Sequence, residues 1–315
     1  MTALIVEVLR HECFLAAPPV IVDIGASGSL PAVWQPLAPH SICIAFDADK
    51  RDFQVKELQN SGWKKHYSLN RLVAPVASAS IEFYLTKSPH CSSSLRPDTA
   101  ALKAWVFAPL FEVAETVRLP AVELKAVLRE LNLDRVDWFK CDSQGTDLRI
   151  FKSLDTDMTD RTLLAEFEPG IIDSYQGEDK LHEVMAYMEG RPFWVSDMEV
   201  KGSQRMDPGA VASLSYLQRR YPASFLKTSP GWCEVTYLNT CDSSALSLRD
   251  CLLAWVFATI KGQHGFGARL AERGHQRFGS EVFSDLLAFS RAQIDHGYGR
   301  LAIDTCKRLL ARFRR

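Results

Sequence analysis

The chain has 315 residues, of which 47% are hydrophobic and 24% are charged, and its formal net charge at pH 7 is -1. A chain of this length can bury about three-quarters of its unfolded surface, and it is long enough for one or two domains. The composition is that of an ordinary globular protein, and the balanced charge gives no reason to expect a nucleic-acid partner.

Cysteine and histidine spacing argues against a metal site, because the eight residues of each type show neither CxxC nor HExxH spacing. Glu7, Arg10 and Glu12 place charges too early for a signal sequence, so we expect a short helix over residues 1–19 in a cytoplasmic protein with reduced cysteines. The longest apolar run, residues 251–260, is about half as long as a membrane-spanning helix and predicts a buried helix instead.

Two strand-like runs near the N-terminus predict a nucleotide site. Val20–Ile24 opens into a turn rich in Gly and Ser, which is typical of a buried parallel strand followed by a ligand-binding loop. Residues 30–37 have helical spacing, and a second apolar run, Ile42–Phe46, ends at Asp47, 22 residues after Gly25. A carboxylate at this place holds a ribose in nucleotide-binding α/β units, so the stretch predicts an adenosine-containing cofactor.

The rest of the pattern alternates helices with strands. We expect helices over Lys50–Asn60, Pro120–Leu131, Gln144–Leu154 and Glu178–Met188, and strands within Lys64–Ala77 and over Ser80–Lys87, Val113–Leu119, Thr162–Glu168, Arg191–Val200 and Trp232–Asn239. Residues 203–230, inside an α/β domain over residues 20–240, are either a lid over a site or a packed connector. From Ser244 onward the pattern is helical, which predicts a C-terminal extension over residues 244–315.

A further strand precedes Asp142. Strand alternation places Lys140 and Asp142 on the same face, with Asp142 at the C-terminal end, and ligands bind at that edge of open α/β sheets. Asp23, Asp47 and Asp142 would all face this edge, and Glu166 in the following strand could join them. The residues alone leave open a nicotinamide dinucleotide or S-adenosylmethionine (SAM), although the turn after the first strand lacks the third glycine of GxGxxG.

Over Val20–Asn239 the chain resembles the FkbM-type family of SAM-dependent methyltransferases. The resemblance is carried by five segments in this order: DIGASG, AFDAD, CSSSL, DWFKCDSQGTDLRIFKSL and LLAEFE. The most specific part is the element formed by Lys140, Asp142, Gly145 and Asp147, where that family usually reads KIDVEG-x-E. The chain departs from the family at three positions. Ser29 stands where Gly is common, and Asp47 and Asp147 each stand where Glu is usual.

The resemblance implies an α/β fold with a Rossmann-like, seven-stranded, mostly parallel sheet of the class I methyltransferase type. An antiparallel strand would lie near the end of the sheet, and the C-terminal helical extension would follow it. The implied activity is SAM-dependent O-methylation, with the methyl group moved to a hydroxyl of a sugar, a glycan or a glycosylated metabolite.

The resemblance also implies roles for individual residues. The residues implied to bind SAM are Asp23, Gly25, Ala26, Ser27 and Gly28 at its methionine end, Asp47 at its ribose, and Ala74 or its neighbours at its adenine. Asp142 is the first candidate for the general base and Glu166 the second. In the CSSSL loop, Ser93 and Ser94, together with Ser92, are candidates for contacts with the cofactor or the acceptor.

Two other functions stay open at this point, an NAD(P)-dependent enzyme on a Rossmann sheet and a non-catalytic module that binds SAM. The last nine residues include five basic ones. The tail Cys306–Arg315 is therefore either a solvated helix whose cations complement its dipole or a weak contact with a membrane surface. The identity of the acceptor, the atom that is methylated and the oligomeric state are not determined by the sequence.

Overall fold

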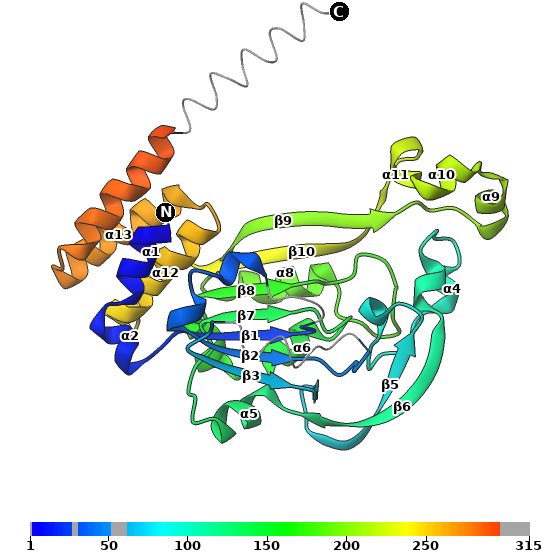
Figure 1. Cartoon of the computed structure of the whole chain (residues 1–315), viewed down its shortest axis with the longest axis horizontal. Helices are drawn as coiled ribbons and strands as arrows, with labels where there is room; N and C mark the ends of the chain where they lie inside the picture. The colour runs from blue at the N-terminus through cyan, green and yellow to red at the C-terminus, as the bar shows by residue number, and fades with distance from the viewer. Residues whose placement is uncertain (1, 27–30, 52–61, 297–315) are drawn as a thin grey trace, which may run out of the picture. The chain divides into compact units, whose positions relative to one another are not determined.

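The computed structural model describes residues 2–26, 31–51 and 62–296, and the chain divides into two compact units. The larger unit comprises residues 18–240, and the other combines residues 1–17 with residues 241–315. Figure 1 shows the α/β architecture of the larger unit and the helices of the other.

The larger unit is built on a seven-stranded sheet with the order β3-β2-β1-β7-β8-β10-β9 (Figure 1). Its strands are β1 (Val20–Ile24), β2 (Ile42–Phe46), β3 (Lys65–Leu69), β7 (Trp138–Cys141), β8 (Leu164–Phe167), β9 (Phe193–Ser203) and β10 (Ser229–Asn239). β10 is antiparallel to β8 and β9, whereas the pairs β3–β2, β2–β1, β1–β7 and β7–β8 are parallel. The sheet is therefore mixed and mostly parallel, with its reversed strand near the end as predicted.

A second sheet of three strands has the order β4-β6-β5, with β4 at Leu72–Val73, β5 at Ser78–Thr86 and β6 at Val113–Val122. The prediction that a helix begins at Pro120 is wrong. Pro120 lies inside β6, beside a shift in the register with β5, and helix α5 begins only at Leu124. Proline is tolerated at an irregular position of a strand, because no hydrogen bond between the strands requires the N–H that proline lacks.

The connection between β1 and β2 also differs from its prediction. In place of an α-helix over residues 30–37, the described part of this connection holds two 3₁₀ turns, η1 (Ala32–Trp34) and η2 (Ala38–His40). Pro36 would lie in the second turn of such a helix, where it lacks the N–H that an α-helical hydrogen bond requires, so a continuous helix cannot form. Leu30 and most of the helix predicted over Lys50–Asn60 fall outside the described residues.

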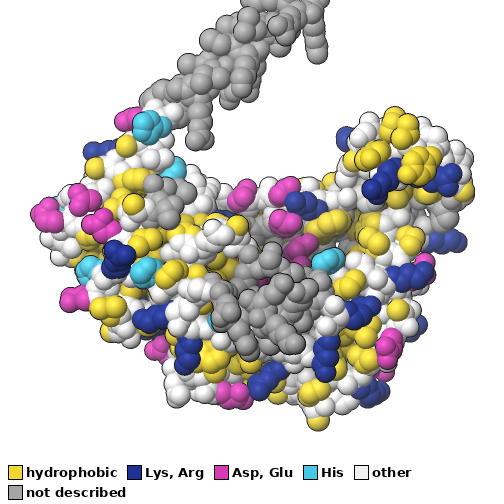
Figure 2. Space-filling view, in the orientation of Figure 1, with side chains coloured by type: hydrophobic (Ala, Val, Ile, Leu, Met, Phe, Trp, Pro, Cys, Tyr) yellow, Lys and Arg dark blue, Asp and Glu magenta, His cyan; other side chains and the backbone are white. Residues whose placement is uncertain are grey.

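An insertion joins β9 to β10 and carries three short helices, α9 (Pro208–Ser213), α10 (Tyr216–Arg220) and α11 (Pro222–Phe225). The Met206 N–H donates to the Ala104 carbonyl at 2.8 Å, which fastens the start of the insertion to the loop after α4 (Thr99–Leu102). Figure 2 shows apolar and basic side chains gathered on α9–α11. Tyr216, Leu217, Tyr221 and Phe225 are all more than half exposed there. Whether the insertion acts as a lid stays a prediction.

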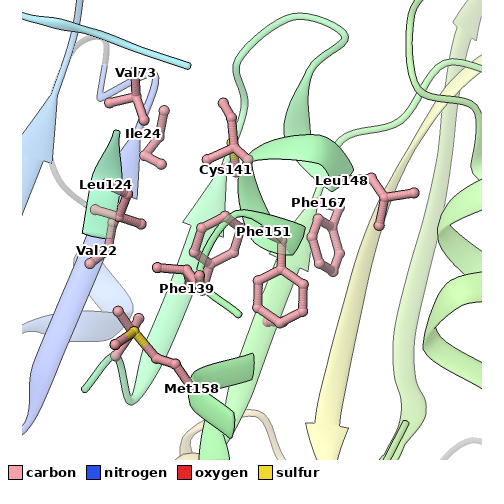
Figure 3. Packing of buried hydrophobic residues seen from close by; sticks show 14 of the residues in the cluster. Val22, Ile24, Val73, Leu124, Phe139, Cys141, Leu148, Phe151, Met158 and Phe167 are labelled. Carbon is pink, nitrogen blue, oxygen red and sulfur yellow. The ribbon is translucent and has the colours of Figure 1, made fainter. Parts of the chain in front are cut away.

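The main core lies against one face of the large sheet, where α5 (Leu124–Glu130), α6 (Asp147–Lys152), α7 (Thr156–Arg161) and α8 (Leu181–Glu189) contribute apolar residues. Phe139 of β7 is fully buried among them, with its ring centroid 4.9 Å from that of Phe151 and 5.8 Å from that of Phe167 (Figure 3). Because strand side chains alternate, the neighbours of Phe139, Trp138 and Lys140, lie on the opposite face.

The second unit is helical, with α1 (Thr2–Leu9), α2 (Glu12–Ala16), α12 (Leu248–Ile260), α13 (His264–Phe278) and a further helix over residues 282–296. Residues 251–259 of α12 are buried, which confirms the buried helix predicted there. Arg249 Nε donates to the Ala17 carbonyl at 2.8 Å and so ties the two sequence segments of this unit together. Within the described ranges, no helix is both long and apolar enough to cross a membrane. The Cys306–Arg315 tail lies outside these ranges.

The substitution Phe139→Ala should lower the free energy of unfolding by about 3–5 kcal/mol, because it leaves a cavity at the centre of the main core. The matched substitution Phe225→Ala removes the same ring from an exposed position in α11, and it should change the free energy by no more than about 0.5 kcal/mol. Urea unfolding followed by circular dichroism measures both values. Equal losses in the two variants would contradict this description of the core.

Candidate active site

Two hollows at the carboxyl ends of the parallel strands share one lining residue, Asp142. The first, which we call the β1–β2 pocket, has a volume of about 50 Å³, and its lining includes Gly25, Asp47, Val73 and Asp142. The second, the β7–β8 cavity, has a volume of about 450 Å³, and Asp142 and Glu168 lie in its lining. Groups bound in the two hollows would therefore meet at Asp142, at the edge where open α/β sheets bind ligands.

Gly25 brings the ends of β1 and β7 together. Its φ is +79°, and a Cβ atom added there would lie 2.0 Å from the carbonyl oxygen of Asp142, so only glycine fits. The Asp142 N–H donates to the Ile24 carbonyl at 2.9 Å, and the Gly25 and Ala26 N–H groups both donate to the Phe46 carbonyl at 2.9 Å. The turn after β1 is thus fastened to both neighbouring strands. Ser27 and Gly28, the next residues of the predicted cofactor turn, lie outside the described residues.

Asp47 directly follows β2 and lies in the wall of the β1–β2 pocket, as expected for a residue that holds a ribose. Its Oδ1 accepts from the Asp49 N–H at 2.7 Å, which fixes the carboxylate. Leu72 and Val73 form an apolar part of the same wall, while Ala74 is buried beside them and is not in the described lining. A carboxylate facing an apolar wall suits a ribose and a flat base, but small-molecule sites usually measure about 300–1,000 Å³. A nucleoside would therefore require this pocket to widen.

Asp23 is held in an ion pair rather than in a pocket wall. Lys140 Nζ lies 2.6 Å from Asp23 Oδ1, and the Asp23 side chain is 2% exposed. Burial acts to lower the pKa of Lys140, but the Asp23 carboxylate outweighs it and raises that pKa overall. The described lining of both hollows lacks Asp23. Its observed partner is Lys140, and its contact with a cofactor stays a prediction.

The serines of the CSSSL loop play different parts. Ser92 lines the β1–β2 pocket and accepts a hydrogen bond from Arg51 Nη2 at 2.9 Å. Ser93 is fully buried and donates to the Gln144 carbonyl at 2.8 Å, so it holds the loop after β7 in place. Ser94 is partly buried and, like Ser93, is missing from the described lining of both hollows. Of the three serines, Ser92 is therefore the one placed to contact a ligand.

Aromatic rings form much of the wall of the β7–β8 cavity. The ring centroid of Phe107 lies 5.3 Å from that of Phe111 and 6.0 Å from that of Trp232, and Phe111 lies 5.6 Å from Tyr175. Phe107 and Phe111 come from the segment between β5 and β6, and Trp232 comes from β10. Gly202 of β9 also contributes, so residues far apart in sequence enclose the cavity.

Asp142 and Glu168 form a hydrogen-bonded pair of carboxyl groups in the cavity. Burial, followed by the charge and the hydrogen bond of Asp142, raises the pKa of Glu168 to about 9. Burial also raises the pKa of Asp142, although Lys140 acts in the opposite direction. Glu168 is therefore the member of the pair that holds a proton near neutral pH, while the neighbouring Lys140 cation favours the ionised form of Asp142. Among the described residues, no group of three or more His, Cys, Asp and Glu side chains is placed to hold a metal ion.

Gln144 links this pair to Tyr175. The Gln144 Nε2 donates to Asp142 Oδ1, and the Tyr175 hydroxyl lies 2.7 Å from Gln144 Oε1. Gln144 has a φ of +59°, an uncommon conformation for a residue with a side chain. The backbone conformation and the tyrosine together aim the amide at Asp142.

Asp147, the last residue of the element that resembles the family motif, connects the ends of β7 and β8. Its Oδ1 accepts from the Ser143 N–H at 2.9 Å, and its Oδ2 accepts from the Glu168 N–H at 2.8 Å. Burial and the nearby charge of Asp142 raise the pKa of Asp147 to about 6. Asp147 therefore positions the backbone that carries both carboxyl groups of the pair.

Sequence reasoning chose Glu166 as the second candidate base and missed Glu168. In the structure, Glu166 Oε2 accepts from Trp138 Nε1 at 2.7 Å, and the described lining of both hollows does not contain Glu166. Glu168 lies two residues later, immediately beyond the end of β8. The sequence signal was present, because catalytic residues in such sheets lie just past the ends of strands.

Comparison with known protein families gives a match in the central part of the chain. Residues 47–193 match the family model described as "Methyltransferase FkbM domain". This match confirms the resemblance seen in the sequence and covers the CSSSL loop, the strand ending before Asp142, and Glu168. No curated protein and no solved structure gives a significant match to the chain.

Glu168→Gln should remove a dependence of stability on pH. Because the folded-state pKa of Glu168 is raised from 4.5 to about 9, the contribution of its carboxyl group to stability is fully present below pH 4.5 and is lost as the pH rises toward 9. The slope for one proton is at most about 1.4 kcal/mol per pH unit. In urea unfolding between pH 6 and 9, the variant should gain stability relative to the wild type as the pH rises.

The exposed Glu189 at the end of α8 provides a control for this measurement. Glu189→Gln removes a carboxyl group from a helix surface without changing the pair, and its curve should run parallel to that of the wild type. If the curve of stability against pH for Glu168→Gln also ran parallel to that of the wild type, the raised pKa of Glu168 would be refuted.

Proposed function

We propose that the FkbM methyltransferase domain identified over residues 47–193 makes this chain a SAM-dependent O-methyltransferase that acts on a hydroxyl group of a sugar, a glycan or a glycosylated metabolite. The observation that carries the proposal is the position of Asp142 in the walls of both hollows. Methyl transfer requires the donor and the acceptor to meet in one orientation, and such positioning can supply about 7–11 kcal/mol of the barrier.

The cofactor belongs, in this proposal, in the β1–β2 pocket. Asp47 would accept the ribose hydroxyls, Leu72 and Val73 would border the adenine, and the backbone at Gly25 would border the methionine end. The carboxylate, the apolar side chains and the backbone groups of this pocket match the ribose, the adenine and the methionine end of SAM. Bound there, SAM would supply an electrophilic methyl group.

The carboxyl pair provides a place for the proton that an alcohol must lose. In our proposal the acceptor hydroxyl approaches Asp142 from the β7–β8 cavity and gives its proton to the pair as its oxygen takes the methyl group. A general base contributes about 10²- to 10⁴-fold, and it works best when its pKa lies near the operating pH. The raised pKa values of Asp142 and Glu168 support this role, so Glu168 takes the place of Glu166 as the second residue of the proposal.

The β7–β8 cavity supports a carbohydrate acceptor. Its volume of about 450 Å³ accommodates a small ring, and its aromatic side chains offer flat apolar surface next to carboxyl and amide groups. A sugar ring presents the matching combination of apolar C–H faces and hydroxyl edges. Trp232 and Phe107 would contact the faces, while Glu168 and Gln144 would bind hydroxyl groups.

Calorimetry should distinguish the proposal from the two alternatives. S-adenosylhomocysteine (SAH) and SAM should bind the full chain, and NAD(P) should not. Tight binding of NAD(P) without binding of SAH would overturn the proposal in favour of a nucleotide-dependent oxidoreductase. If SAM bound but was not consumed with any acceptor in a broad set of glycosides, the chain would instead be a non-catalytic SAM-binding module.

Asp142→Asn should lower the methyl transfer rate by about 10²- to 10⁴-fold, because it removes the proton acceptor without changing the shape of the side chain. Binding of SAH should stay within about threefold of the wild type, a change of less than about 1 kcal/mol. The measurements are transfer of a labelled methyl group from SAM to methyl glycosides, and calorimetry with SAH. Loss of SAH binding in this variant would assign Asp142 to the cofactor site instead.

A further inference from the structure

The lining of the β7–β8 cavity has an unusual charge balance. Its described residues include Asp142, Glu168, Glu178 and the histidine His90, but no lysine or arginine. Lys180 lies behind one of these acids, with its Nζ 2.6 Å from Glu178 Oε1, and so neutralises that carboxylate. The negative charge of the Asp142–Glu168 pair is therefore the charge that a ligand in the cavity would meet.

The aromatic wall provides the second observation. Phe107 and Trp232 belong to a connected set of rings that continues through Phe111 to Tyr175. Aromatic faces attract cations, and they do so most strongly where water is excluded. A cavity that joins several ring faces to a buried negative charge, with no lysine or arginine in its described lining, has the recognition chemistry of an ammonium site.

We infer that the β7–β8 cavity selects an acceptor whose reacting hydroxyl stands beside a protonated amine, as in an amino sugar or another amino alcohol. This inference rests on the proposed function, because it assigns the cavity to the methyl acceptor. The ammonium lies between the aromatic wall and the Asp142–Glu168 pair, and the neighbouring hydroxyl reaches Asp142. Acceptors with a carboxylate or phosphate at this end are excluded by repulsion from the pair.

The proton on Glu168 adds a consequence that binding experiments can detect. A cation next to the pair favours its fully ionised form, so the pKa of Glu168 should fall when an amine binds. Near pH 6.5, where the amine of an amino sugar is itself mostly protonated, binding should therefore release up to about one proton into the buffer. A neutral sugar at the same place should release none.

The experiment uses four probes that share one sugar ring, namely methyl glucosaminide, methyl glucoside, methyl N-acetylglucosaminide and methyl glucuronide. Each is titrated into the full chain, with and without saturating SAH, in buffers of different ionisation enthalpy. The glucosaminide should bind about tenfold more tightly than the glucoside and should release a proton, while the glucuronide should bind at least about tenfold more weakly than the glucoside. Equal affinities, or preference for the glucuronide, would overturn the inference.

Two variants separate recognition from a general loss of structure. Glu168→Gln should abolish proton release and reduce the preference for the glucosaminide without removing it, because Asp142 keeps its charge, and Trp232→Leu should weaken the glucosaminide most. Glu189→Gln, outside the described lining of the cavity, should keep the full preference. Glucosaminide binding that is unchanged in both Glu168→Gln and Trp232→Leu would contradict the proposed ammonium site.

The same samples distinguish this inference from the proposed function. Failure of SAH to bind would refute the methyltransferase proposal, while the preference for the amine can still be measured without SAH. Methylation of the neutral glucoside in preference to the glucosaminide would refute the inference and leave the methyltransferase intact. Methylation at the nitrogen of the glucosaminide would support the ammonium site but contradict O-methylation.

Discussion

The close contact of Gly25 with the carbonyl of Asp142 is the constraint on which the site depends. It brings the ends of β1 and β7 within a distance that no side chain allows, and the Asp142 N–H completes the contact by bonding to Ile24. Because of this approach, one residue, Asp142, can belong to the walls of both hollows. A wider separation of the two strands would divide the cofactor side from the acceptor side, and Asp142 could then serve only one of them.

The charges around Asp142 are arranged in two layers. Within the sheet, Asp23 and Lys140 neutralise each other on the face opposite the main core. Beyond the strand ends, Asp142 and Glu168 are hydrogen-bonded and have raised pKa values, since burial disfavours two adjacent negative charges. The ion pair therefore contributes to the sheet, whereas the carboxyl pair supplies the groups that can exchange a proton with a bound molecule.

The acceptor side is assembled from segments that the sheet topology brings together. Phe107 comes from the segment between β5 and β6, Glu168 follows β8, and Trp232 lies in β10. The insertion after β9 is fastened to the same loop region by the hydrogen bond from Met206 to Ala104. The FkbM match ends at residue 193, so Trp232 and the insertion belong to a part of the larger unit that the match does not cover. Differences in this region could change the acceptor without changing the motif at Asp142.

By itself, the sequence determined the alternation of strands and helices and the placement of Asp47 and Asp142 at strand ends, because these features follow from local periodicity and from residue order. The reversed strand near the end of the sheet was implied by the resemblance to the FkbM-type family. The sequence pattern misplaced the start of the helix after β6 and proposed a helix at Pro31, since proline also fits irregular strands and 3₁₀ turns. Only the tertiary structure decided that Asp23 pairs with Lys140, that Glu168 rather than Glu166 enters the cavity, and that four distant aromatic rings line it. Each of these depends on which strands become neighbours and on which side chains pass the edge of the sheet, and local sequence patterns carry no information about that pairing.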